Sequence, residues 1–326
     1  MTEGLGELFG HRLLIISGKG GTGKTAVVAA LGMLAASRGC ECVVVEVSGE
    51  QRLPELLAAE PAKLPAQDGR QPVRLGPGLS ALSIDPQTAL IEYLELQLPL
   101  RSLARFIVER AGIRQLLEAA PGWRELITLG KIWHLQSGGG RSGTGPEPEL
   151  LIVDAPATGQ GLALLATPGV VIDTVRRGRL RLHTDRVQAL LRDPARTRVV
   201  PVTLAEELPV RETASLCQKL GELGLTFGPI LVNAVEDAPD AGVDPDSVQL
   251  ERASLDLVSP ASLRASWEHA VQRAAEQRRC LRELEGLKLA PVVELPYLAT
   301  GIESFGEVVE LAHQLEKAFA RRESRP

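Results

Sequence analysis

A glycine-rich run near the N-terminus, Gly18–Thr25, constrains the fold more than any other feature of the chain. Its sequence, G-K-G-G-T-G-K-T, matches the phosphate-loop pattern G-x-x-x-x-G-K-[ST]. The apolar run Leu13–Ile16 precedes it, and a segment rich in alanine, valine and leucine follows it. A strand, a glycine loop and a helix in this order let backbone N–H groups and the helix dipole converge on phosphate oxygens. The run therefore predicts a phosphate loop between a strand and a helix.

The loop contains candidate ligands for phosphates and for a metal ion. Lys24 places a positive charge on the β- and γ-phosphates of a nucleotide, and the hydroxyl of Thr25 is a candidate Mg²⁺ ligand. The residues whose backbone is expected to bind the phosphates are Gly20, Gly21, Thr22, Gly23, Lys24 and Thr25. The pattern thus predicts a nucleotide site built mainly from backbone atoms.

A second lysine in the loop, Lys19, has no role in an ordinary phosphate loop. It gives the run K-G-G-T-G-K-T, which is the deviant form of the Walker A motif. In that class the early lysine reaches the nucleotide of a partner subunit, as an arginine finger does in other NTPases. The alternative is a solvated loop charge. We expect Lys19 to act in catalysis across a dimer.

The composition is that of an ordinary globular protein with one large or two small domains. The 326 residues are 44% hydrophobic, and a net charge of −5 gives no reason to expect nucleic-acid binding. The apolar stretch at 161–172 is shorter than the roughly 20 residues of a membrane span. The first residues lack the positive region of a signal peptide, so we expect a cytoplasmic protein. The four cysteines form no C-x-x-C, and small buried hydrophobes are favoured over a redox or metal role.

Strand-like and helix-like patterns alternate along the chain, which favours an α/β fold with a mostly parallel sheet flanked by helices. Strands are expected at 13–16, 42–47, 79–85, 150–153, 198–203, 229–233 and 291–295, and helices at 24–37, 206–223, 262–286 and 302–321. Loops are expected at 60–78 and 138–148, and a loop or short insert at 236–260. We expect a single domain spanning 1–326, with a helical subdomain from segments at about 87–136 and 170–192.

Asp154 ends the apolar run at 150–153, which is the Walker B position of a carboxylate near the metal ion. We therefore expect Thr25 and Asp154 to share the metal site. The small-residue turn Ala155–Gly161 follows, and such a turn can register the loss of a γ-phosphate and move. The alternative is an ordinary strand-to-helix turn in which the aspartate caps the helix.

Several segments, taken in order, resemble the ArsA-like ATPases, which include arsenical-pump and tail-anchored-protein targeting ATPases. They are Gly18–Thr25, Ile84–Leu94, Pro121–Gly122, Asp154–Gly159, Glu206–Thr213, the strand ending at Asn233, and Glu294–Pro296. The resemblance implies a P-loop NTPase fold, ATP and Mg²⁺ as cofactors, and a nucleotide-sandwich dimer. It also implies that Asn233 contacts adenine and that the loop at Pro296 and Tyr297 packs on the ring. A lone asparagine at a strand end is otherwise a turn residue.

The chain departs from the family pattern at the first switch. The family usually has T-D-P-A-H there, and its aspartate positions the attacking water, whereas this chain has Ser48 at the aspartate position. Glu46 and Glu50 lie two residues to either side. Because side chains two apart on a strand share a face, we expect Glu46 to act as the catalytic carboxylate and hydrolysis to be slow. Gln160 replaces a histidine common in the second switch.

We therefore expect a dimeric switch ATPase that couples its nucleotide state to an unidentified protein cargo or membrane partner, and not to nucleic acid. The dimer is a homodimer or a heterodimer with a paralogue. A non-hydrolysing ATP-binding regulatory subunit is one alternative, favoured by Ser48. A MinD- or ParA-type positioning ATPase is another, but Arg321, Arg322 and Arg325 are a weak match to a membrane-targeting tail.

Overall fold

The computed structural model describes residues 4–47, 51–64, 68–97, 122–137, 148–238 and 260–323. Within these ranges one sheet has the strand order β3-β4-β2-β5-β1-β6-β7-β8. The strands are β1 (Leu13–Ser17), β2 (Cys42–Glu46), β3 (Val73–Gly76), β4 (Leu79–Ser83), β5 (Leu150–Asp154), β6 (Thr197–Leu204), β7 (Ile230–Val235) and β8 (Val292–Pro296). Neighbouring strands run parallel except for the antiparallel β3–β4 pair. The predicted α/β fold with a mostly parallel sheet is confirmed.

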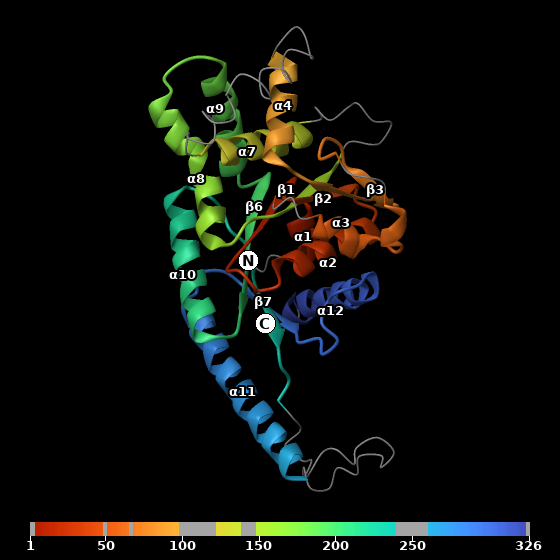
Figure 1. Cartoon of the computed structure of the whole chain (residues 1–326). Coiled ribbons are helices and arrows are strands. Elements are labelled where there is room, and N and C mark those ends of the chain that lie inside the picture. The colour runs from red at the N-terminus through yellow and green to blue at the C-terminus, as the bar shows by residue number, and fades with distance from the viewer. Residues whose placement is uncertain are drawn as a thin grey trace.

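Helices cover both faces of the sheet (Figure 1). On one face lie α1 (Leu5–Phe9), α2 (Lys24–Ser37), α3 (Arg52–Leu57) and α12 (Phe305–Glu323). On the other lie α7 (Trp123–Gln136), α8 (Thr158–Thr174), α9 (Arg179–Arg192) and α10 (Glu207–Glu222). The remaining described helices are η1 (Pro61–Lys63), α4 (Pro86–Gln97) and α11 (Pro260–Gly286). In Figure 1, α11 extends away from the body of the molecule.

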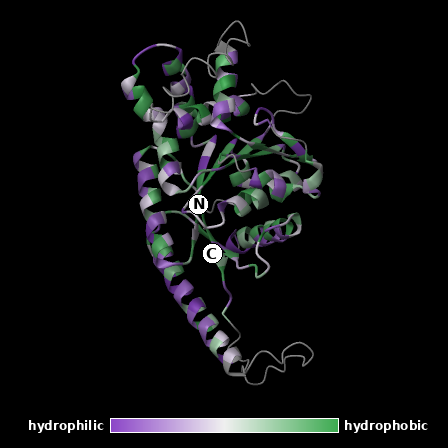
Figure 2. Cartoon of the chain, in the orientation of Figure 1, coloured by the Kyte–Doolittle hydropathy of each residue, from purple (hydrophilic) through white to green (hydrophobic). Residues whose placement is uncertain are grey.

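The central strands are buried on both faces, which explains their continuous apolar sequences. Along β1, Leu14 and Ile16 pack into the core beneath α2 and α12, while Leu13 and Ile15 face the core beneath α7, α8 and α9. This alternation follows from the two-residue period of a strand. Figure 2 shows the same arrangement, with hydrophobic residues concentrated in the sheet and a largely hydrophilic α11.

One expectation about secondary structure is wrong. Residues 60–78 are not all loop, because β3 forms there and pairs with β4 at the edge of the sheet. An edge strand is only half-buried, so its sequence lacks the apolar run that identifies the central strands. The helical stretch expected at 170–192 is formed by two helices: α8 runs from Thr158 to Thr174, and α9 begins after Gly178, whose φ is 110°.

Other expectations fall outside the described residues and stay predictions. They concern Ser48, Glu50, Pro121, Arg325 and the residues at 98–121, 138–147 and 239–259. The predicted helical subdomain is described only at α4, α7, α8 and α9, which contact one another in the pairs α4–α7, α7–α8, α7–α9 and α8–α9. Its status as a separate unit also stays a prediction.

Candidate functional site

The phosphate loop connects the carboxyl end of β1 to the N-terminus of α2, in the centre of the sheet. Gly18, Gly21 and Gly23 have φ values of 152°, 84° and 85°, a region that favours glycine. At Gly23 a Cβ atom would also collide with the side-chain nitrogen of Asn233. The glycines are therefore required by the loop conformation itself, which turns the backbone toward the start of the helix.

Lys24 is the first residue of α2, and its side chain folds back along the loop. Its Nζ donates a hydrogen bond to the backbone oxygen of Lys19 at 3.0 Å. Partial burial lowers the pKa of Lys24, and the negative charge of Asp154 acts in the opposite direction. The ammonium group is thus held at the loop, close to the carboxylate that ends β5.

Thr25 and Asp154 meet directly. The Thr25 hydroxyl donates a hydrogen bond to Asp154 Oδ2 at 2.6 Å. The other carboxylate oxygen, Oδ1, is buried and has no hydrogen-bond partner within the described part of the chain. Burial raises the pKa of Asp154 to about 6, and the Thr25 hydroxyl and the Lys24 charge partly offset this effect.

This pair fits a hydrated Mg²⁺ ion. Magnesium takes oxygen ligands, and in nucleotide sites it usually keeps several waters and needs only one or two carboxylates besides the phosphates. A buried carboxylate oxygen without a partner, next to a threonine hydroxyl, matches that requirement. Among the described residues there is no group of three or more His, Cys, Asp or Glu side chains that could hold a metal by themselves.

Glu46 lies beside Asp154, because the two residues are in register on the neighbouring parallel strands β2 and β5. Its side chain is only 2% exposed, and its charge raises the pKa of Asp154. Glu46 Oε2 accepts a hydrogen bond from the backbone nitrogen of Leu53 at 3.0 Å, in the first turn of α3. The sequence predicted a position for Glu46 near the metal site, but no sequence motif signals this contact with α3.

The structure also brings Asn233 to the phosphate loop. Its side-chain nitrogen donates a hydrogen bond to the backbone oxygen of Thr22 at 3.1 Å. Pro296 ends β8 at the same edge of the sheet, and the backbone nitrogen of Tyr297 donates to the oxygen of Val235 at 2.9 Å. The Tyr297 side chain is 53% exposed. The residues expected near adenine therefore lie near the carboxyl ends of the adjacent strands β7 and β8, and Asn233 touches the loop.

The side chain of Lys19 contacts α10. Its Nζ lies 3.2 Å from Glu212 Oε1, and both side chains are about one-third exposed, at 36% and 37%. Glu212 belongs to the Glu206–Thr213 segment that carries part of the family resemblance, so the sequence did contain a signal for it. An exposed ion pair of this kind contributes about 0–1 kcal/mol, so little free energy holds Lys19 in this position.

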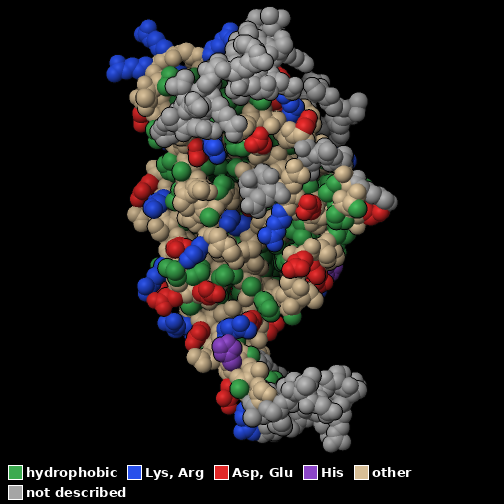
Figure 3. Space-filling view, in the orientation of Figure 1, with side chains coloured by type: hydrophobic (Ala, Val, Ile, Leu, Met, Phe, Trp, Pro, Cys, Tyr) green, Lys and Arg blue, Asp and Glu red, His purple; other side chains and the backbone are tan. Residues whose placement is uncertain are grey.

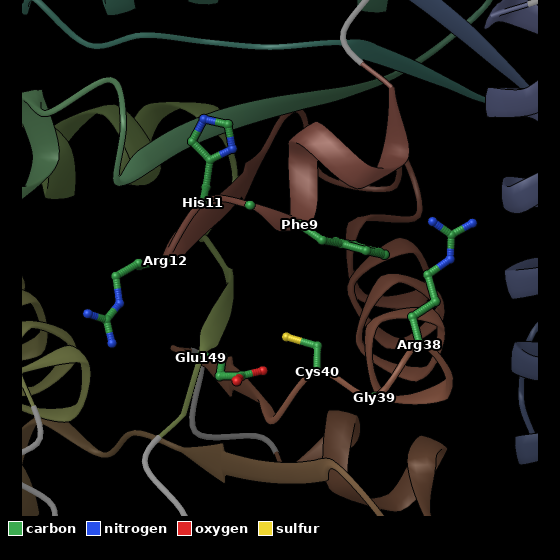
Figure 4. A pocket seen from close by; sticks show the side chains of 8 residues that line it. Phe9, His11, Arg12, Arg38, Gly39, Cys40 and Glu149 are labelled. Carbon is green, nitrogen blue, oxygen red and sulfur yellow. The ribbon is translucent and has the colours of Figure 1, made fainter.

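A separate pocket of about 570 Å³ lies at the opposite end of the strands (Figure 4). It is lined by Phe9, Gly10, His11, Arg12, Arg38, Gly39, Cys40 and Glu149, which precede β1, β2 and β5. Burial and the nearby Glu149 carboxylate raise the pKa of the Cys40 thiol to about 11. The thiol is therefore protonated near neutral pH and is a poor nucleophile. This pocket is not part of the nucleotide site.

Within the described ranges, no helix combines the length and the apolar character that crossing a membrane requires.

The known proteins that this chain resembles include ATPases. The family model for the anion-transporting ATPases matches residues 11–179, which include the phosphate loop and Asp154. The ATPase BagA of Mycobacterium tuberculosis is 29% identical over 331 residues, covering 97% of this chain and 95% of that protein. The arsenical pump-driving ATPase of Acidiphilium multivorum is 27% identical over 251 residues, covering 72% of this chain and 41% of that protein.

Proposed function

Because this chain belongs to the anion-transporting ATPase family, we propose that it is a Mg²⁺-dependent ATPase whose nucleotide state opens and closes a dimer. The observation that carries the proposal is the direct hydrogen bond between Thr25 and Asp154, next to the phosphate loop. These two residues come from α2 and β5, far apart in the sequence, and they are the two expected metal-site residues. Family membership supports the ATPase activity itself.

Each residue of the site has a role in this proposal. The loop backbone and Lys24 bind the phosphates, and Asn233 links the phosphate loop to the adenine side of the site. Thr25 and Asp154 would hold Mg²⁺, which, when bound, neutralises charge on the phosphate oxygens. Asp154 must be ionised to do so, and the nearby Lys24 charge and Thr25 hydroxyl favour the ionised form.

Glu46 has two candidate roles in hydrolysis. It either positions the attacking water or fixes α3 against the site through its bond to Leu53. The bond to Leu53 favours the second role, because a carboxylate that holds a helix is less available to orient water. The usual catalytic aspartate is replaced by Ser48 in this chain. If Glu46 contributes to hydrolysis only by fixing α3, turnover should be slow.

Lys19 is the proposed link between the subunits. In the single chain it pairs with Glu212, and the weak exposed pair can exchange for the phosphates of a partner's nucleotide. ATP then favours the closed dimer because it adds contacts that the open form lacks. We propose that this change is transmitted to a partner, either a protein cargo or a membrane component.

Measuring nucleotide binding by Lys24→Ala tests whether the phosphate loop is a nucleotide site. The wild-type protein should bind a fluorescent ATP analogue in the presence of Mg²⁺, and the variant should bind at least about tenfold more weakly, because it loses a charge-assisted interaction with phosphate. Lys219→Ala, at an exposed position on α10, is the matched control and should bind normally. Wild-type affinity in Lys24→Ala would refute the nucleotide site.

Turnover separates the proposal from its main alternative, a regulatory subunit that binds ATP without hydrolysing it. Phosphate release by the wild-type protein, abolished in Lys24→Ala, supports an ATPase. Tight ATP binding without any phosphate release, with and without a dimer partner, would favour the regulatory subunit.

A further inference from the structure

The connection between α8 and α9 concentrates positive charge in a chain whose net charge is −5. Residues 176–182 have the sequence R-R-G-R-L-R-L, with four arginines in seven positions. The segment lies where α8 and α9 meet at one end of the molecule (Figure 1). In Figure 3, Lys and Arg side chains project into solvent from the same end.

Exposed aliphatic side chains accompany these arginines. Val170 is 63% exposed, Leu180 40% and Leu182 51%. They are three of the nine large hydrophobic side chains that are exposed in the described part of the chain, and all three lie between positions 170 and 182. We call Val170, Arg176, Arg177, Arg179, Leu180 and Leu182 the α8–α9 tip.

Hydrogen bonds from Arg181 connect the two helices at the tip. Arg181 Nε donates to Asp185 Oδ1 at 2.9 Å, and its Nη1 donates to the backbone oxygen of Ile172 at 2.6 Å. Arg181 thus ties the start of α9 to the end of α8. By contrast, Arg176 and Arg177 are exposed and form no ion pair with any residue in the described ranges. Residues 173–185 contain four arginines against two aspartates, Asp173 and Asp185, so the segment has a net charge of +2 with its histidine neutral.

We propose that the α8–α9 tip docks onto the surface of an anionic lipid bilayer. Exposed arginines attract anionic headgroups, and the aliphatic side chains between them can enter the boundary between headgroups and acyl chains. Each basic residue near such a surface favours binding by about fivefold, so a few arginines with two or three aliphatic contacts give reversible peripheral binding.

A bilayer fits the tip better than an acidic peptide does. Arginine clusters can bind acidic motifs as well, but such a motif needs only the arginines, whereas a bilayer also takes up the exposed Leu180 and Leu182 side chains between them. The proposal does not depend on nucleotide binding, since none of the tip residues belongs to the phosphate loop or the metal site.

Sedimentation with lipid vesicles, using the full chain without nucleotide, tests the proposal. The wild-type protein should sediment with vesicles of phosphatidylglycerol and phosphatidylcholine in equal parts, but not with phosphatidylcholine alone. Binding should weaken as salt is raised. The double variant Arg176→Glu/Arg177→Glu should bind at least about 25-fold more weakly, since it removes two fivefold contributions. Leu180→Gln/Leu182→Gln should bind several-fold more weakly at the same net charge.

The matched control is Arg279→Glu/Arg282→Glu, which makes the same change of charge at two exposed positions of α11. It should bind vesicles like the wild type. Thermal unfolding and binding of the ATP analogue should be unchanged in all three double variants, which separates a docking defect from misfolding and from a failure of the proposed ATPase.

Three outcomes would overturn the proposal. One is a wild-type protein that does not sediment with anionic vesicles. Another is an equal loss of binding in the α11 control, which would mean that only overall charge matters. The third is binding to a polyglutamate peptide, abolished in Arg176→Glu/Arg177→Glu, by a protein that ignores vesicles; the tip would then be a site for an acidic protein.

Discussion

Gly23 is the residue at which the phosphate loop, α2 and β7 meet. A larger residue is disfavoured there for two separate reasons: the φ of 85° is strained for a residue with a Cβ atom, and the Asn233 side-chain nitrogen would have to move. The phosphate-loop motif demands glycine here for the backbone conformation. The structure adds a steric demand from β7 that the motif alone does not contain.

Gly23→Ala should therefore destabilise the nucleotide-free protein. We expect a decrease of about 1–3 kcal/mol in the free energy of unfolding, measured with urea, because the left-handed backbone is strained by a Cβ atom and Asn233 must move. Gly20→Ala is the matched control, since a Cβ atom there would make only an ordinary contact, 3.8 Å from the Cβ of Ala157. Equal stability of Gly23→Ala and the wild type would contradict the loop conformation described above.

Glu46 has two proposed roles, water positioning and anchoring of α3, and two substitutions at this residue separate them. Glu46→Gln keeps an oxygen that can accept the hydrogen bond from Leu53 and removes only the charge beside Asp154. If the charge positions water, turnover should fall about a hundredfold with little change in ATP affinity. If Glu46 only fixes α3, turnover should change little in this variant.

We expect the second result, with Glu46→Ala losing turnover because the anchor of α3 is gone. Steady-state phosphate release and ATP affinity, measured separately, decide between the two roles. Glu55→Gln, at an exposed position of α3, is the control and should behave like the wild type. Weaker ATP and Mg²⁺ binding in Glu46→Gln would instead assign Glu46 to the metal site.

At the scale of elements, α12 is the final helix that covers α2 on one face of the sheet. Phe319, near its C-terminal end, is 2% exposed and belongs to the same apolar core as Leu14 and Ile16 of β1. A helix that carries the phosphate loop at its N-terminus is thus supported by a helix from the opposite end of the chain.

Phe319→Ala should cost about 3–5 kcal/mol of unfolding free energy, because it removes a large side chain from a packed core. Urea unfolding of Phe319→Ala and of the control Phe305→Ala tests this, since Phe305 begins the same helix at a much more exposed position. A similar decrease in both variants, or none in either, would mean that α12 does not pack on α2 as described.

At the scale of the whole molecule, the proposed dimer depends on Lys19. Lys19→Ala should leave ATP binding to the single chain nearly unchanged but reduce ATP-dependent dimerisation about tenfold or more, since the variant lacks a charged group that can bind phosphate. Light scattering with a non-hydrolysable ATP analogue measures the dimer, and Lys219→Ala on α10 is the control. Equal dimerisation by Lys19→Ala and the wild type would return Lys19 to the role of a solvated loop charge.

A variant of Glu212 tests independently whether Lys19 leaves its ion pair with Glu212 to bind the partner's nucleotide. If the pair with Glu212 holds Lys19 in the single chain, Glu212→Gln should make the closed dimer form at a lower concentration of the ATP analogue. The shift should be no more than about fivefold, because the exposed pair contributes only about 0–1 kcal/mol.

Local patterns in the sequence determined the phosphate loop, the strands that follow apolar runs, and the carboxylate at the end of β5. These features depend on residues close together in the chain, and their strand ends differ from prediction by a residue or two. The edge strand β3 was not foreseen, because a half-buried strand carries a weaker hydrophobic pattern than the central strands.

Only the tertiary structure decided which distant side chains meet. Asn233 reaches Thr22 across 211 positions of sequence, and Thr25 reaches Asp154 across 129. The order of the strands in the sheet sets these pairs, and no periodicity records it. The motifs supplied the expectation for Thr25 and Asp154, but they did not contain the bond from Glu46 to α3 or the position of the α8–α9 tip. Those features depend on where the ends of helices and strands lie after packing, and the packing of the helices on the sheet determines those positions.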